Sequence, residues 1–429
     1  NSAIRVIGNK RGSYSYTGGG SFSGGGTSTI TYNPVRNFNP GEQVSLIQNI
    51  NCEATSLINM ARGQQTIFWG AAGSANAQFS SPTSLTLSIG SVYHVETADL
   101  DGDTDLDVAF IFVNSGGFLS LAISLNDGTG LFSTPTVLFD GYDDFDNGTT
   151  QINSIALGDL NNDGDVDIAA SISGSQSINV YSNNGIGTFT TTTYFKGEDY
   201  LASQLSDMDS DGDLDYVCAN QAAGTLEYYL NNGTGNFSGT NILVLTIAGL
   251  QTFVTGDFNN DRLMDIISTR STSSFIRISL QQNTLGTFIT TATATGIAGT
   301  SLEKIKILDV EGDGDLDVAA HNLATDNLVI FMVNNGAGAF SAGFNTGLSV
   351  IPLQQFDIAD FDGDGDMDLF TSSNAINGYN IYKNNAGTFT FFFNSSLGAT
   401  QTINAVATGD LDGDGDIDIM SGTTQLTTR

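Results

Sequence analysis

Short apolar runs rich in β-branched and aromatic residues recur along most of this 429-residue chain, and aspartate-rich stretches separate them. One apolar run precedes each stretch, such as IALG at 155–158, and another follows it. Runs of this length and composition predict strands, so each acidic stretch is expected to join two strands of a hairpin. The seven runs that follow are LDVAFIFV (106–113), VDIAASI (166–172), LDYVCA (214–219), MDIIS (264–268), LDVAA (316–320), MDLF (367–370) and IDIM (417–420).

A third apolar run, such as LSLAISL at 119–125, leads into a second turn signature that ends in phenylalanine. Its Asn-Gly pairs are typical of tight hairpins, and a fourth strand is expected after the phenylalanine. Each unit then contains four antiparallel strands over about 50 residues, which is the size of a propeller blade. The copies of this signature are NDGTGLF (126–132), NNGIGTF (183–189), NNGTGNF (231–237), QNTLGTF (282–288), NNGAGAF (334–340) and NNAGTF (384–389).

The two ends of the repeat region predict the number of blades. Only IMSGTTQLTTR (419–429) follows the last acidic stretch, which is too short for two more strands. The segment from QTIFW (65–69) to SPTSLTLSI (81–89) resembles the missing second half of a unit. We therefore expect an all-β fold in which residues 65–429 form a seven-bladed β-propeller of four-stranded antiparallel blades. Pairing of N-terminal with C-terminal strands would close the ring and leave no free edge.

The net charge of -33 is concentrated in the acidic stretches, which hold 32 of the 46 acidic residues. Nucleic acid is excluded as a partner because a phosphate backbone requires a basic face. No apolar run is long enough to span a membrane. Because the chain begins at Asn1 with neither an initiator Met nor a signal peptide, we expect a processed form or a piece of a longer protein.

The acidic stretches share one spacing, with Asp, Asn or Glu at positions 1, 3, 5 and 9, and usually a glycine at position 6. Alternate side chains of a tight loop can converge on one point, and glycine permits the turn. Several oxygen ligands on a flexible loop favour Ca²⁺ over Mg²⁺. Seven copies of one spacing argue against acidic turns without metal. An EF-hand would need Glu at position 12 and flanking helices, whereas Phe110 and Ala170 occupy that position here.

This pattern resembles the FG-GAP/VCBS repeats of calcium-binding propellers, which occur in integrin α heads and in many secreted bacterial proteins. The resemblance covers roughly residues 65–429. It implies about seven Ca²⁺ ions, one per blade, held by the side chains at positions 1, 3, 5 and 9 and by the position-7 carbonyl. An acidic side chain at position 7 need not bind. The implied metal-site residues are Asp99, Asp101, Asp103, Asp105 and Asp107; Asp159, Asn161, Asp163, Asp165 and Asp167; Asp207, Asp209, Asp211, Asp213 and Asp215; Asp257, Asn259, Asp261, Leu263 and Asp265; Asp309, Glu311, Asp313, Asp315 and Asp317; Asp360, Asp362, Asp364, Asp366 and Asp368; and Asp410, Asp412, Asp414, Asp416 and Asp418.

Two copies depart from the pattern at position 6. Arg262 takes the place of glycine in the fourth copy, which has only three carboxylates, and Thr104 does so in the first. We expect the fourth site to be the weakest.

Residues 1–64 differ in kind from the repeats, with five basic and two acidic residues that leave a net charge of -36 for the rest. The phrase TSTITYNPVRNFNPGEQVSLI (27–47) resembles part of a bacterial Ig-like module, although 64 residues are too few for a whole sandwich. A β-rich extension is the alternative. Cys218 is expected to be a buried free thiol, with a bridge to Cys52 as the alternative.

The sequence offers three functions, of which an extracellular adhesion or interaction module on a cell surface or in the matrix is favoured. A glycan-binding lectin is the second. A calcium-dependent polysaccharide lyase is the third, but we expect no enzyme. The sequence contains no nucleophile motif, zinc spacing or phosphate loop, and His94 and His321 are expected to be structural. FDGYDDFDNGTT (139–150) is either a longer solvated loop or an added site from Asp143, Asp144 and Asp146.

Overall fold

The computed structural model describes ten segments of the repeat region and six short strands before it. The segments are 91–144, 148–270, 275–284, 286–294, 302–322, 328–341, 344–345, 353–373, 378–396 and 401–425. The chain divides into two compact units, of which the first contains Asn1–Ser80 and the second contains most of the chain from Ser81 onward.

The N-terminal unit contains two antiparallel three-stranded sheets. One has the order β1-β4-β3 and the other β2-β5-β6. The strands are β1 (Ile4–Ile7), β2 (Ser13–Tyr16), β3 (Gly20–Ser23), β4 (Thr29–Pro34), β5 (Leu46–Asn49) and β6 (Thr55–Leu57). The predicted β-rich character of this segment is confirmed, whereas its likeness to an Ig-like module stays a prediction.

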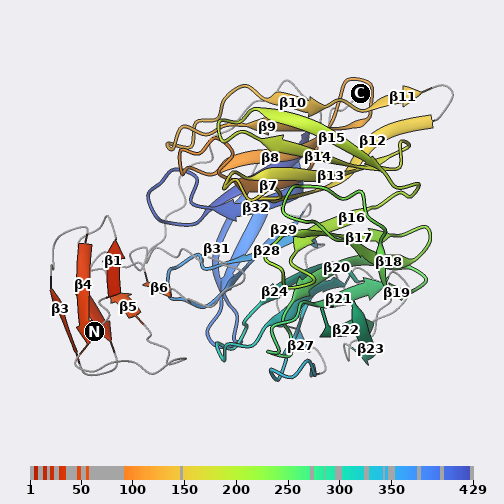
Figure 1. Ribbon diagram of the computed structural model, residues 1–429. Helices are drawn as coiled ribbons and strands as arrows, with labels where there is room; N and C mark the ends of the chain where they lie inside the picture. Colours follow the sequence, from red (N-terminus) through yellow and green to blue (C-terminus); the bar gives the residue numbers. More distant parts are fainter. Residues whose placement is uncertain are drawn as a thin grey trace. The chain divides into compact units, whose positions relative to one another are not determined.

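The second unit is built from antiparallel sheets in which consecutive strands are neighbours (Figure 1). In the first blade β7 (Val92–Ala98), β8 (Asp107–Val113), β9 (Leu119–Ser124) and β10 (Thr136–Phe139) follow one another. The first acidic loop joins β7 to β8, as the apolar pattern predicts. All residues of β8 from Asp107 to Phe112 are buried because neighbouring sheets cover both of its faces.

Five further blades repeat this arrangement. Their strands are β11 (Tyr142–Asp144), β12 (Gly148–Gly158), β13 (Asp167–Ser173), β14 (Ser177–Asn183) and β15 (Phe189–Phe195); β16 (Ala202–Ser206), β17 (Asp215–Asn220), β18 (Thr225–Tyr229) and β19 (Ile242–Thr246); β20 (Leu250–Gly256), β21 (Asp265–Arg270), β22 (Phe275–Asn283) and β23 (Thr287–Ala294); β24 (Leu302–Leu308), β25 (Asp317–Asn322), β26 (Leu328–Met332) and β27 (Phe344–Asn345); and β28 (Leu353–Ala359), β29 (Asp368–Ser373), β30 (Gly378–Lys383) and β31 (Thr390–Ser396).

The second blade has a fifth strand that arises from the insertion at 139–150. Tyr142 pairs with Thr150 across a hairpin formed by β11 and β12. This part of the insertion is therefore a paired hairpin, in which Tyr142 is exposed to solvent. The alternative of an added site from Asp143, Asp144 and Asp146 concerns side chains outside the described ones.

The prediction of seven four-stranded blades is wrong for the part of the chain that the structure describes, which has six. The last sheet contains only β32 (Gln401–Gly409) and β33 (Asp418–Gln425). The expected partner strands at 65–89 lie outside the described residues.

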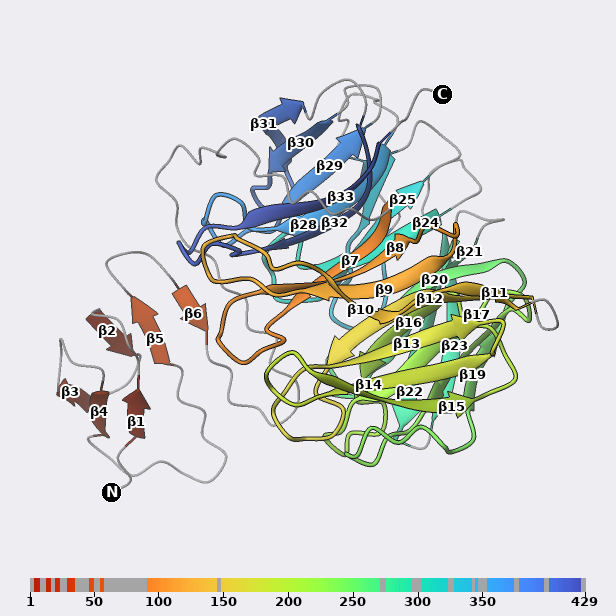
Figure 2. The same ribbon diagram turned by 90° about the horizontal axis from the view of Figure 1, so that it is seen from above.

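The first and last sheets nevertheless pack against each other. β32 lies beside both β28 and β7, so the first strands of successive sheets follow one another in a cycle (Figures 1 and 2). Val92, Val95 and Phe110 of the first blade share a buried apolar cluster with Ala405 and Ala407 of β32. Within the described residues, side-chain packing rather than strand pairing closes the cycle.

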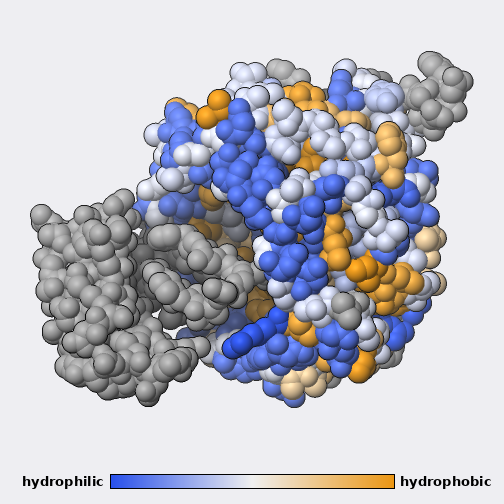
Figure 3. All heavy atoms as spheres, viewed as in Figure 1, coloured by the Kyte–Doolittle hydropathy of each residue, from blue (hydrophilic) through white to orange (hydrophobic). Residues whose placement is uncertain are grey.

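The core consists of apolar clusters between neighbouring sheets. Ile111 and Ile123 of the first blade pack with Ile155 and Ile168 of the second, and similar clusters join the later pairs. On the face drawn in Figure 3, polar and apolar residues of the second unit are interspersed. None of the described residues forms a helix with the length and apolar character needed to cross a membrane.

Candidate metal-binding loops

The first residue of each acidic loop closes the turn with its carboxylate. Asp99 accepts hydrogen bonds from the backbone N–H groups of Gly102 at 2.7 Å and Thr104 at 2.9 Å. Asp309 does the same for Gly312 at 2.7 Å and Gly314 at 2.8 Å. The turn therefore wraps around the position-1 side chain and brings the following acidic residues close to it.

The ninth residue of each loop is the first residue of the second strand, and in six copies it is fully buried. In the first copy, the two oxygens of Asp107 accept the N–H of Leu100 at 2.7 Å and that of Asn126 at 2.6 Å. Asp215 accepts those of Met208 and Asn231, each at 2.8 Å. This aspartate thus ties the acidic loop to the second hairpin of its own blade.

Positions 1, 3 and 9 converge in five of the seven copies. In each, one carboxylate oxygen from every residue lies within 4.8 Å of the others. The second and fourth copies carry Asn161 and Asn259 at position 3, so they offer an amide oxygen there instead. The five clusters are Asp99, Asp101 and Asp107; Asp207, Asp209 and Asp215; Asp309, Glu311 and Asp317; Asp360, Asp362 and Asp368; and Asp410, Asp412 and Asp418.

Several loop oxygens are buried without a hydrogen-bond donor. Asp101 Oδ1, Asp159 Oδ1 and Glu311 Oε2 are such atoms. Burying an acceptor without a partner is costly, and each additional carboxylate adds repulsion. A hard cation among the carboxylates would satisfy these atoms and remove the repulsion, so the donor set fits Ca²⁺.

The electrostatics of the loops indicate the same chemistry. Burial raises the pKa of Asp107 and Asp167 to about 6 and the pKa of Asp215 and Asp265 to about 7. The pKa of Asp101 is also raised, mainly by desolvation and then by the charge of Asp103. Without a cation, ionising these carboxylates therefore costs free energy.

Positions 5 and 7 lie differently from the converging residues. The position-5 carboxylate accepts the N–H of position 7, as in Asp103 with Asp105 at 3.0 Å. The position-7 side chain lies at the second hairpin of its own blade. Asp213 also accepts a hydrogen bond at 2.6 Å from Asn162, which belongs to the acidic loop of the preceding blade. Neither position contributes a side chain to the five clusters, so for position 7 only the carbonyl stays a predicted ligand.

The residue that opens the second hairpin links successive blades, a role that the sequence analysis missed. Asn183 Nδ2 donates to the carbonyl oxygen of Leu100 in the preceding acidic loop at 2.8 Å and to that of Val166 at 3.0 Å. We call this arrangement the asparagine clasp. It is formed by Asn126, Asn183, Asn231, Gln281, Asn334 and Asn384.

The recurrence of an amide side chain before each second turn was the signal in the sequence. It was interpreted only as turn chemistry because the carbonyl that it reaches lies 71 to 83 residues away in five of the clasps. In the sixth clasp, Asn126 donates to Leu411 O of the last sheet at 2.7 Å and so joins the two ends of the cycle.

The FG-GAP-like repeat family matches four overlapping segments of the chain, at 207–268, 257–320, 309–371 and 360–421. Together these segments cover half of the chain. The chain belongs to the FG-GAP-like repeat family. Each match begins at position 1 of one acidic loop and extends past the next loop, so an FG-GAP-like repeat here contains two acidic loops and the second hairpin between them. No curated protein sequence matches the chain.

Several solved structures are similar to this FG-GAP-like protein at low sequence identity. The BP39L lectin from Burkholderia pseudomallei has a TM-score of 0.57 and 12% identity, over 77% of this chain and 93% of that one. The WD40 domain of coronin from Toxoplasma gondii has a TM-score of 0.47 and 11% identity, over 79% and 88%. A putative 6-phosphogluconolactonase from Bacteroides uniformis has a TM-score of 0.45 and 11% identity, over 80% and 92%.

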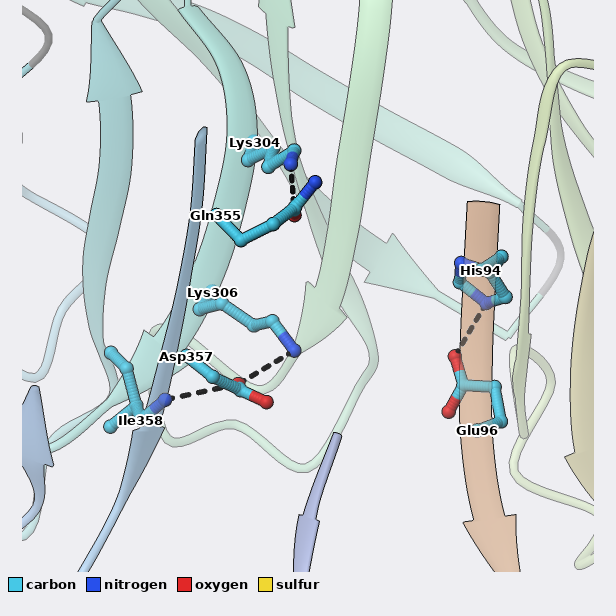
Figure 4. A network of polar contacts seen from close by, with 7 residues as sticks. All are labelled: His94, Glu96, Lys304, Lys306, Gln355, Asp357 and Ile358. Carbon is cyan, nitrogen blue, oxygen red and sulfur yellow. Dashed lines mark hydrogen bonds and ion pairs between the residues drawn. The ribbon is translucent and has the colours of Figure 1, made fainter. Parts of the chain in front are cut away.

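A second polar cluster lies on the first strands of three sheets (Figure 4). On β7, His94 Nε2 lies 3.0 Å from Glu96 Oε1, and across from it Lys306 Nζ lies 2.9 Å from Asp357 Oδ1. Burial acts to raise the pKa of Glu96. The hydrogen bond with His94 and the charges of His94 and Lys306 outweigh burial, so the pKa of Glu96 is lowered. His321 is buried in β25. The structural role of both histidines stays a prediction.

Cys218 is a free thiol buried in β17, as the sequence predicts. Burial raises its pKa well above the ordinary value of a thiol. A buried, protonated thiol is a poor nucleophile. Cys52 lies outside the described residues.

Proposed function

We propose that the acidic loops bind Ca²⁺, with one ion in each loop. The observation that carries this proposal is the convergence of Asp99, Asp101 and Asp107 within 4.8 Å, with Asp101 Oδ1 buried and without a donor. The side chains at positions 1, 3, 5 and 9 and the carbonyl at position 7 would hold the ion. Ca²⁺ accepts six to eight oxygen ligands and tolerates irregular geometry, which suits short loops that differ at positions 3 and 6.

Calcium would also change the charge of the whole repeat region. Seven divalent ions reduce its net charge from -36 to about -22, which leaves the protein acidic and well solvated. When bound, the ion supplies positive charge to the loop. The hydrogen bonds of positions 1 and 9 hold the loop residues in place for the ion. Because the ion binds only the folded loop, its binding would stabilise the fold in turn.

We propose that the protein acts outside the cell as an adhesion or interaction module. Calcium loops of extracellular modules bind with dissociation constants of roughly 10⁻⁴–10⁻³ M, so they fill where calcium is millimolar. The blades hold two sets of loops on a closely packed β-structure, which is how rigid scaffolds present binding residues. We propose a binding rather than a catalytic role, since the loop carboxylates are engaged in the turns and His94 is paired with Glu96.

Isothermal titration calorimetry of the metal-free chain with CaCl₂ tests the calcium proposal. Asp209→Ala removes the position-3 oxygen ligand from one cluster, whereas Asp213→Ala makes the same change in the same loop at position 7. We expect Asp209→Ala to bind about one ion fewer at low millimolar calcium and Asp213→Ala to bind the full number. Equal stoichiometry in the two variants, or no heat of binding to the parent chain, would contradict the proposal.

A glycan-binding module is the second candidate function. The BP39L lectin, whose fold this chain shares at a TM-score of 0.57, is described as a lectin, and a cavity between two blades of this chain has a lining that suits a sugar. A glycan array probed with calcium-loaded protein tests this candidate. Binding to defined glycans supports it, and binding to none of them contradicts it.

A further inference from the structure

A cavity of about 320 Å³ lies between the third and fourth blades. Leu245 and Thr246 of β19 and the following Ile247 line one side. Arg277 of β22 and Thr290 of β23 line the other. None of these residues belongs to an acidic loop, so the cavity is distinct from the candidate metal-binding loops.

The strand register places Arg277 on the face of the fourth blade that packs against the third. Arg277 pairs with Ser268, and Ile266 pairs with Ser279, two residues along the same strand. Residues two apart in a strand share a face, so Arg277 lies on the same side as Ile266. Ile266 packs with Leu226 and other residues of the third blade.

Arg277 has no hydrogen bond or ion pair with any other residue that the structure describes. Its Nε is buried and has no hydrogen-bond partner, and the same holds for Oγ of Ser268, its cross-strand neighbour. A buried guanidinium N–H without an acceptor destabilises a protein. The wall of this cavity therefore contains a donor that lacks its acceptor.

The surroundings add positive charge at this place. Arg270 Nε donates to the carbonyl oxygen of Ala248 at 2.9 Å, one residue after Ile247 of the cavity wall. Two of the eight basic residues that follow residue 64 thus lie at one contact between blades, in a part of the chain with a net charge of -36. Such a local reversal of charge favours an anionic group on the ligand.

The lining identifies the class of ligand. A guanidinium binds a carboxylate with two parallel hydrogen bonds. Leu245 and Ile247 offer an apolar surface for the C–H face of a sugar ring, and the hydroxyls of Thr246 and Thr290 suit ring hydroxyls. We infer that this cavity binds a carboxylated sugar, such as a uronic acid residue of a polysaccharide, with Arg277 holding the carboxylate.

This inference rests on the glycan-binding candidate and gives it a site. The probe is the methyl glycoside of galacturonic acid, with methyl galactoside as the neutral comparison, both at fixed calcium. Saturation-transfer NMR and calorimetry on the full chain measure binding. We expect the uronate to bind at least ten times more tightly than the neutral sugar.

Three variants test the role of the cavity. Arg277→Gln removes the guanidinium, and Thr290→Trp fills the cavity from an exposed position while Arg277 stays in place. Lys383→Gln, in the sixth blade, is the control for the loss of one positive charge. We expect at least a tenfold loss of uronate affinity in the first two and none in the third. Thermal melting checks that each variant is folded. If Arg277→Gln does not fold, Thr290→Trp still tests whether the ligand binds in the cavity.

Two results would overturn the inference. One is that the parent chain does not bind the uronate, and the other is that both cavity variants bind it as tightly as the parent chain does. The second result would overturn the assignment of the cavity, yet it would leave the glycan-binding candidate standing.

Discussion

The ninth residue of each acidic loop belongs to the candidate metal site and also accepts hydrogen bonds that hold the blade together. In the third copy, both oxygens of Asp215 accept backbone N–H groups, one from its own loop and one from the second hairpin. A carboxylate oxygen has more than one lone pair, so these bonds leave it able to bind a cation. Folding the blade therefore positions this ligand before any ion arrives.

The pKa of these aspartates predicts how stability depends on pH without metal. Burial raises the pKa of Asp107 to about 6 and the pKa of Asp215 to about 7, from an ordinary value of 3.8. Between pH 4 and 7 the folded state thus holds protons that the unfolded chain has released. Stability of the metal-free protein should therefore rise as the pH falls from 8 to 5.

Urea midpoints of protein stripped of metal on a chelating resin check this dependence. In saturating calcium we expect the opposite trend, because protons and the cation compete for the same oxygens. A metal-free midpoint that falls steadily from pH 8 to pH 5 would contradict the assignment.

Position 6 of the fourth loop contains a strained residue. Arg262 has a φ of +72°, where Gly164 and Gly212 of other loops have φ values of +94° and +99°. The left-handed region costs a residue with a side chain roughly 1–2 kcal/mol, while glycine adopts it freely. Arg262→Gly should therefore raise the free energy of unfolding by up to about 1 kcal/mol and tighten calcium binding at this site.

Arg262→Ala separates the two effects, because it removes the charge and keeps the Cβ atom. It should tighten calcium binding without the gain in stability. Equal denaturant midpoints for the two variants in the absence of calcium would show that strain at this φ is not the cause.

At the scale of the element, the asparagine clasp joins each second hairpin to the acidic loop before it. Asn231 Nδ2 donates to the carbonyl oxygens of Leu160 at 2.8 Å and Leu214 at 3.1 Å, and Asn231 is buried. The clasp of the fourth blade uses Gln281, where the pairing of β22 with β23 is irregular. The longer side chain thus occurs where the backbone departs from the regular register.

Asn231→Ala should lower the free energy of unfolding by about 1–3 kcal/mol, because it removes two buried hydrogen bonds, although Leu160 O keeps the N–H of Gly235 at 2.7 Å. Urea denaturation measures the effect. Asn232→Ala, at the exposed neighbouring position, is the control and should change stability little. A loss of the same size in both variants would mean that the turn, and not the link between blades, needs asparagine.

The elements also show what the sequence could predict. Each strand–loop–strand unit was predicted correctly because its signals are local: an apolar run, a fixed acidic spacing and a second apolar run. The same spacing predicted that positions 1, 3, 5 and 9 converge, and positions 1, 3 and 9 do so in five copies, whereas position 5 belongs to none of these clusters. The clasp was missed because the recurring amide also fits a tight turn, and nothing in the sequence marks the carbonyl that it reaches in another blade.

At the scale of the whole molecule, local sequence patterns could not predict the number of complete blades. The prediction of seven relied on pairing residues 65–89, which lie outside the described residues, with the end of the chain more than 300 residues later. Six blades and the two-stranded sheet β32–β33 are described. Asn126 and the apolar cluster around Val95 and Ala405 connect this sheet to the first blade.

The same cyclic arrangement makes the calcium proposal testable on the molecule as a whole. Each acidic loop touches the clasp of the next blade through its position-2 carbonyl, as Leu100 does with Asn183. Repulsion within one empty loop therefore weakens a contact between two blades, and seven loops would act on one cooperative structure.

Thermal unfolding of the intact chain, stripped of metal and then supplied with 5 mM CaCl₂ or 5 mM MgCl₂, tests the central claim most directly. We expect calcium to raise the midpoint strongly and magnesium to raise it much less, because the loops suit the larger and more flexible coordination of Ca²⁺. A midpoint that is the same with and without calcium would contradict the account.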